Sequence, residues 1–146
     1  MSAAGVDRFI ELGAGKVLTG ELLQLRAGAD VTTVDISGAV SGVTADLLVN
    51  ATPCGMFPHT DESPVNEDFF RRQGAAYVFD AIYNPAETQL LRSAKAHGAK
   101  TLGGIPMLVY QAALAQEIWH GRERGSMFRE EDLQRLCGLV QAEITG

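Results

Sequence analysis

The chain has 146 residues, of which 46% are hydrophobic and 21% are charged, and its formal net charge is −6. This length suits one domain with a substantial core, and the composition is ordinary for a globular protein. The negative charge and the lack of a basic run argue against nucleic acid or a membrane as partner. No apolar segment approaches membrane-spanning length and the start lacks a signal-peptide pattern, so we expect a cytoplasmic protein.

Residues 6–36 are predicted to form one βαβ unit. A strand is expected at 8–12, and leucines at helical spacing follow it until Gly28 ends the helix. The β-branched residues of 31–36 predict the second strand.

A glycine turn joins the first strand to its helix. Gly13 and Gly15 would let the backbone approach a phosphate or sugar at the helix N-terminus. Asp35, at the end of the next strand, is placed to accept hydrogen bonds from ribose hydroxyls. We therefore predict all three as cofactor-binding residues, although Leu18 stands where a dinucleotide fingerprint has its third glycine.

A polar turn follows the apolar residues 47–49. Their unbroken apolar run predicts a buried parallel strand, and Pro53 ends it because proline lacks an N–H. Ligands of open α/β sheets bind beyond the carboxyl ends of such strands, so Asn50 and Thr52 are expected to face a ligand. The alternative is a strand followed by an ordinary polar turn.

The remaining elements alternate between helix and strand. They are a helix at 66–72, a strand at 76–82, a helix at 88–97, a strand at 100–102, and helices at 107–120 and 129–143. We expect an α/β fold: one three-layer Rossmann-like domain over residues 1–146, with a mainly parallel sheet of about five strands. The loops after Thr52, Asn84 and Gly104 should then share one sheet edge.

The sequence gives little indication of a metal site or of a reactive cysteine. The three histidines show no metal spacing, so no metal site is predicted. Cys54 and Cys137 are too few for a disulfide framework, and Cys54 has no basic neighbour in sequence that would activate it.

The first βαβ unit resembles two families. Its glycine turn with Asp35 beyond looks like the cofactor motif of class I S-adenosylmethionine methyltransferases, and residues 5–20 look like a segment of bacterial malonyl transacylases. Both resemblances end near Ser37, and we interpret them as a generic βαβ unit.

The second half resembles shikimate dehydrogenases in three motifs. These are DLLVNATPCGM at 46–56, DAIYNPAETQLL at 80–91 and GIPMLVYQAA at 104–113, which ends in WHG at 119–121. Their order over residues 45–121 matches the C-terminal, NAD(P)-binding domain of that family. The resemblance implies an oxidoreductase of aromatic amino acid biosynthesis.

The resemblance also implies roles for individual residues. It assigns Asn50, Ala51, Thr52, Met56, Gly104 and Met107 to the cofactor's ribose and nicotinamide, and Tyr83 and Gln111 to the substrate. Gln111 has independent support because it lies within an apolar stripe, where an amide is costly without a partner. A Gln satisfied by nearby backbone is the alternative.

The implied function is the dinucleotide-binding part of a shikimate or quinate dehydrogenase-like enzyme. The family's catalytic Lys–Asp pair belongs to an N-terminal substrate domain that nothing here matches, so no catalytic residue is predicted and the chain is expected to be incomplete on its own. The expected cofactor is NAD or NADP. Asp35, without a following Arg, favours NAD because an acid repels a 2′-phosphate.

Other interpretations stay open. The chain could be a non-catalytic binding or scaffold domain of engineered or truncated origin, or it could bind S-adenosylmethionine. The expected partners are a dinucleotide, a shikimate-like substrate and a second copy in a homodimer.

Overall fold

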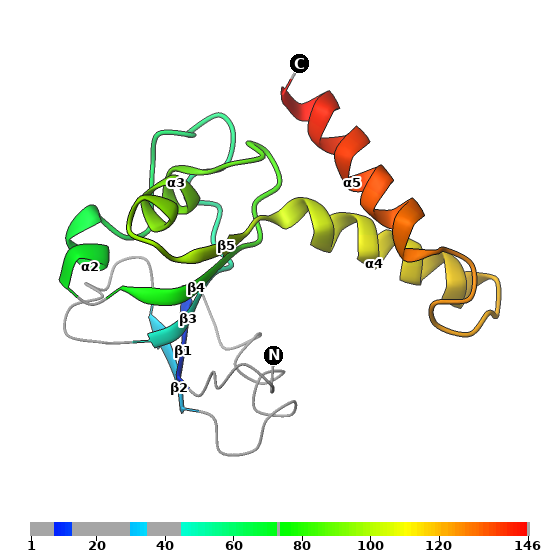
Figure 1. Ribbon diagram of the computed structural model, residues 1–146, viewed down its shortest axis with the longest axis horizontal. Coiled ribbons are helices and arrows are strands. Elements are labelled where there is room, and N and C mark those ends of the chain that lie inside the picture. Colours follow the sequence, from blue (N-terminus) through cyan, green and yellow to red (C-terminus); the bar gives the residue numbers. More distant parts are fainter. Residues whose placement is uncertain (1–7, 13–29, 35–44, 73, 146) are drawn as a thin grey trace.

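The computed structural model describes residues 8–12, 30–34, 45–72 and 74–145 (Figure 1). Its five strands form one sheet in the order β2-β1-β3-β4-β5. The strands are β1 (Arg8–Leu12), β2 (Asp30–Val34), β3 (Ala45–Asn50), β4 (Ala75–Asp80) and β5 (Lys100–Leu102). All four pairings are parallel, which confirms the predicted α/β fold with a parallel sheet.

The strand order reverses direction beside β1. The chain passes from β1 outward to β2, and then returns to the other side of β1 to form β3. Asn50, the last residue of β3, lies opposite Leu12 of β1 and Asp80 of β4. These three strands therefore end together, and ligands of open α/β sheets bind beside such a reversal.

Four helices are described: α2 (Glu67–Arg72), α3 (Gln89–Ala96), α4 (Gly104–Trp119) and α5 (Glu130–Thr145). The α3 helix packs against β4 and β5, and α2 packs against α3. The α4 helix runs outward from the end of β5, and α5 folds back along it (Figure 1). The helix predicted between the first two strands lies outside the described residues.

The β3 strand lies at the centre of the hydrophobic core. Three successive residues, Leu47, Leu48 and Val49, are each at most 5% exposed, so both faces of the strand are covered. This confirms the prediction of a buried parallel strand. Leu48 packs in one cluster with Val78 of β4 and Leu90 of α3.

Several element boundaries differ from the prediction, and two of these differences have a clear physical reason. The α4 helix begins at Gly104 rather than Met107, because Pro106 lies in its first turn, where a missing N–H costs no helical hydrogen bond. The β4 strand ends at Asp80 rather than Ile82, because the Ile82 N–H donates to the Asp80 side chain (3.1 Å).

The α4 and α5 helices form a hairpin whose turn is organised by one carboxylate. Glu117 is 3% exposed and accepts hydrogen bonds from the backbone N–H groups of Gly125 (2.8 Å) and Met127 (3.0 Å). The Tyr110 hydroxyl donates to Glu130 across the two helices, which raises the pKa of Tyr110 to about 12. None of the helices in the described ranges is long and apolar enough to cross a membrane.

Replacing Glu117 with Gln should loosen this turn. The N–H groups of Met127 and Gly125 lower the pKa of Glu117 below its ordinary value of 4.5. A lowered pKa stabilises the folded turn above that value, and the stabilisation disappears as the pH falls through the folded-state pKa. We expect lower hydrogen-exchange protection at Gly125 and Met127 at neutral pH, with a difference that shrinks in acid.

Glu123→Gln is the matched control, because Glu123 lies in the same turn and is exposed. Equal protection of the two amides in the Glu117 and Glu123 variants at neutral pH would contradict the role of Glu117.

Candidate functional site

Three loops meet at the carboxyl edge of the sheet. The Ala81 N–H donates to the Asn50 carbonyl, the Phe57 N–H to the Asn84 carbonyl, and the Gly104 N–H to the Ile82 carbonyl, each at 3.0 Å. The prediction that the loops after β3, β4 and β5 share one edge is therefore confirmed.

A network of buried polar side chains joins these loops from inside. The Asn50 amide donates to Asp80 Oδ1 (3.0 Å), which also accepts from the Ile82 N–H. The Thr88 hydroxyl donates to Asp80 Oδ2 (2.6 Å), and the Thr52 hydroxyl and N–H donate to Asn50 Oδ1 (2.7 and 3.0 Å). Asp80 therefore accepts from β3, from its own loop and from Thr88, the N-cap of α3.

This network is buried, and its side-chain polar atoms are hydrogen-bonded. Asn50 and Asp80 are 0% exposed, Thr88 is 1% exposed and Thr52 is 5% exposed. Among the described residues, no buried side-chain nitrogen or oxygen lacks a hydrogen-bond partner. The side chains of Asn50 and Thr52, which the sequence predicted to face a ligand, thus face the interior and their own loop.

Asp80 is a buried carboxylate held by neutral donors. Burial raises its pKa above the ordinary value of 3.8, and the hydrogen bonds from Thr88, Ile82 and Asn50 oppose that shift. No basic side chain pairs with it within the part of the chain that the structure describes. Ionised Asp80 therefore costs folding free energy that only hydrogen bonds offset.

The pH dependence of stability should show this cost. A pKa raised by folding stabilises the native state below the unfolded-state value of 3.8, and that contribution is lost as the pH rises through the folded-state pKa. Asp80→Asn removes the ionisation. We expect wild type to lose stability relative to Asp80→Asn over that rise, measured by urea unfolding at successive pH values. Parallel stability curves would contradict the assignment.

Five of the predicted site residues have exposed side chains. Met56, Tyr83 and Met107 are 42%, 44% and 40% exposed, and Ala51 and Gln111 are exposed as well. Gln111 does not lie in a buried stripe, because α4 turns that face outward and Ile118 on it is 66% exposed. The argument that burial demands a partner for Gln111 is therefore wrong, and its role rests on the resemblance alone.

Gly104 is buried at the junction between α4 and the loop after β4. A Cβ at this position would lie 2.2 Å from the Ala81 carbonyl oxygen and 2.7 Å from the Ile82 carbonyl carbon. A glycine is therefore needed here because the backbone of the loop after β4 packs directly against it. The predicted cofactor residues Gly13, Gly15 and Asp35 lie outside the described residues.

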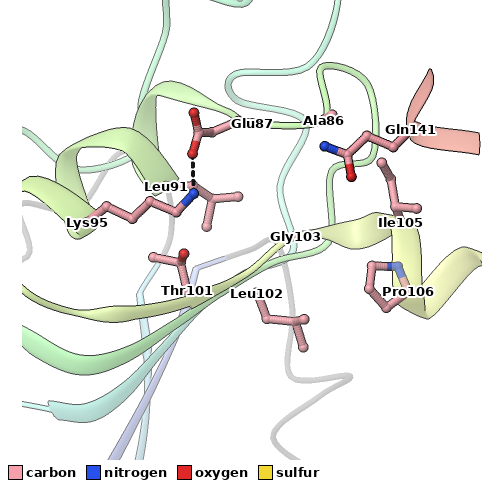
Figure 2. A pocket seen from close by; sticks show the side chains of 10 residues that line it. All are labelled: Ala86, Glu87, Leu91, Lys95, Thr101, Leu102, Gly103, Ile105, Pro106 and Gln141. Carbon is pink, nitrogen blue, oxygen red and sulfur yellow. Dashed lines mark hydrogen bonds and ion pairs between the residues drawn. The ribbon is translucent and has the colours of Figure 1, made fainter. Parts of the chain in front are cut away.

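A groove of about 360 Å³ lies beside β5 (Figure 2). The ion pair between Glu87 and Lys95 lies along one wall, and Gln141 reaches in from α5. None of the four network side chains lines this groove, although Ala86 and Gly103, from the loops after β4 and β5, do.

Sequence reasoning missed the joint role of Asp80 and Thr88. The sequence feature that indicated this role was an acid at the end of an apolar strand, followed eight residues later by a threonine at the N-cap of a helix. Only the register that places Asp80 opposite Asn50 shows that the two strand ends share one network.

Curated relatives that match this chain include several shikimate dehydrogenases. A shikimate dehydrogenase (NADP(+)) from Crocosphaera subtropica is 46% identical over 98 residues, which are 66% of this chain and 33% of that protein. The chain is similar to part of a shikimate dehydrogenase. It spans about a quarter to a half of the length of the curated relatives it matches. No family model matches it.

Solved shikimate dehydrogenases share the fold. The chorismate mutase/shikimate 5-dehydrogenase fusion protein from Clostridium acetobutylicum superposes with a TM-score of 0.79 at 26% identity, over 99% of this chain and 57% of that chain. The enzyme from Thermus thermophilus, solved with NADP(H) and shikimate, has a TM-score of 0.61 at 27% identity, over 90% and 54%. The Rossmann-like fold and the predicted resemblance of residues 45–121 to the family's C-terminal, NAD(P)-binding domain are confirmed.

Proposed function

We propose that this chain is the dinucleotide-binding part of a shikimate or quinate dehydrogenase-like oxidoreductase, formed as one Rossmann-like domain over residues 1–146. The observation that carries the proposal is the joined set of loops at the carboxyl edge, built from two of the stretches that resemble shikimate dehydrogenases. The NADP(H) and shikimate in the Thermus thermophilus structure support the ligand class.

The side chains at this edge suit a flat, partly apolar ring. Met56, Met107 and Tyr83 expose 40–44% of their surface there, and covering them with a nicotinamide would remove apolar area from water. Ala51 would contact the neighbouring ribose, while Tyr83 and Gln111 would meet the substrate. Asn50, Thr52 and Gly104 would act through their backbone and through the shape they impose.

Gly13, Gly15 and Asp35 would hold the other half of the cofactor. When bound, the nicotinamide would exchange a hydride with a ring carbon that carries the substrate's hydroxyl. Asp35 favours NAD, whereas the curated relatives are named for NADP(+), so competition between the two dinucleotides decides the preference.

We also propose that these 146 residues do not catalyse the reaction by themselves. Removing the hydroxyl proton needs a base within about 2.6–3.2 Å of it, and the resemblance places the family's pair in a substrate domain that is not matched here. A one-sided site also loses much of the rate gained by holding the reactants together. We therefore infer that the 146-residue chain binds the dinucleotide without turnover. Light scattering would show whether it does so as a monomer or as the expected homodimer.

Calorimetric titration of the 146-residue chain with NAD⁺, NADP⁺ and S-adenosylmethionine tests the proposal. We expect one of the dinucleotides to bind and S-adenosylmethionine not to bind. Incubation with shikimate or quinate and each dinucleotide should produce no reduced nicotinamide absorbance. Binding of S-adenosylmethionine alone would reject the dinucleotide assignment, and steady turnover would reject the incompleteness.

A further inference from the structure

We propose that Asp80 is a positioning residue for the nicotinamide end of the dinucleotide. This inference rests on the proposed function. Asp80 is too deeply buried to touch a ligand, since none of its surface is exposed. Its effect would pass through the three loops that its carboxylate oxygens join.

The Oδ1 atom holds two of these loops at once. It accepts from the Asn50 amide, whose own oxygen holds Thr52 in the turn before Met56. It also accepts from the Ile82 N–H, and the Ile82 carbonyl accepts from the first N–H of α4, that of Gly104. One oxygen atom therefore constrains the turn before Met56 and the start of the helix that carries Met107.

The Oδ2 atom holds the far end of the loop after β4. It accepts from the Thr88 hydroxyl at 2.6 Å, and that hydroxyl oxygen accepts from the Leu91 N–H in the first turn of α3. The loop that carries Tyr83 is thus closed at both ends on the same carboxylate. A neutral residue without two acceptor oxygens cannot reproduce this arrangement.

The network lies in a different part of the sheet from the strands that precede the residues expected to bind the adenosine half of the cofactor. The network lies at the ends of β3 and β4. The strands that the glycine turn and Asp35 follow in the sequence, β1 and β2, lie on the other side of the strand reversal. Disturbing Asp80 should therefore weaken contacts with the nicotinamide and leave contacts with the adenosine half intact.

The experiment compares two ligands that differ only in the nicotinamide. One is the reduced dinucleotide that wild type prefers, NADH or NADPH, followed by its fluorescence. The other is the matching fragment without the ring, ADP-ribose or 2′-phospho-ADP-ribose, followed by calorimetry. The variants are Asp80→Asn and Thr88→Val, with Thr88→Ser as the conservative replacement that keeps the hydroxyl. Asp68→Asn changes an exposed acid on α2 and is the control.

We expect Asp80→Asn and Thr88→Val to bind the reduced dinucleotide about tenfold more weakly. This is somewhat less than a hydrogen bond to a charged group contributes, because the lost bond acts on the ligand only through the loops. Both should bind the ring-free fragment as wild type does, and Thr88→Ser and Asp68→Asn should bind both ligands normally. If thermal melting shows that Asp80→Asn is unfolded, the same comparison is made with Thr88→Val. This variant keeps the carboxylate and removes one of its three donors, together with the acceptor of the Leu91 N–H.

Two results would overturn the inference. Equal weakening for both ligands would show a general loss of structure, and unchanged affinity for both would show that the loops are positioned without the carboxylate. Failure of wild type to bind either ligand would overturn the proposed function itself, before any variant is compared.

Discussion

Replacing Gly104 with Ala is expected to destabilise the protein by about 3 kcal/mol, at the upper end of the range for inserting atoms into a packed interior. The added Cβ would meet the Ala81 carbonyl oxygen at 2.2 Å. Because this neighbour is backbone at the end of β4, it cannot rotate away as a flexible side chain would. Relief would require α4 to separate from the loop after β4, which would break the hydrogen bond from the Gly104 N–H to the Ile82 carbonyl.

Urea unfolding of Gly104→Ala measures this effect, and Gly138→Ala is its control. Gly138 lies inside α5, and a Cβ there would meet nothing within 4 Å. Alanine at that site should stabilise the helix by up to about 1 kcal/mol, because alanine forms helices better than glycine. A Gly104 variant as stable as wild type would show that the junction is looser than the structure indicates.

Asn50→Ala should also cost about 3 kcal/mol, because it would leave several buried polar groups without partners. The Thr52 hydroxyl and N–H would lose their common acceptor, and Asp80 Oδ1 would lose one of its two donors. Water cannot easily replace the amide, because Asn50 is 0% exposed and Thr52 is 5% exposed. Such a loss is a large share of the roughly 5–15 kcal/mol that stabilises a typical domain.

Asn66→Ala is the matched comparison for Asn50→Ala. Asn66 is exposed and caps α2, with its Oδ1 accepting from the Phe69 N–H at 3.1 Å. Loss of this cap should cost about 1 kcal/mol. Chemical unfolding of the two variants under one condition ranks them. An Asn50 variant no less stable than the Asn66 variant would mean that the buried network contributes little.

The sequence predicted where the loops of the candidate site lie better than it predicted where their side chains point. The motifs at 46–56 and 80–91 indicated the family and which loops matter, and parallel pairing implied that those loops share an edge. What these motifs did not indicate was the direction of each side chain. A polar residue at a strand end can face a ligand or another strand end, and the local sequence is the same in both cases.

The amino-acid sequence by itself determined the class of the fold and its buried centre. The unbroken apolar run at Leu47, Leu48 and Val49 required a strand covered on both faces, and the N-cap Thr88 set where α3 begins. Such features depend on neighbours along the chain, so local patterns are enough to predict them.

Only the tertiary structure decided what the polar residues do. The pairing of Asn50 with Asp80 joins residues 30 positions apart, and it turned Asn50 and Thr52 inward. The close approach of Ala81 to Gly104 explains that glycine by packing against the chain itself. Both facts follow from the register of β3 with β4 and from the angle at which α4 leaves β5. Neither depends on any pattern that a single segment carries.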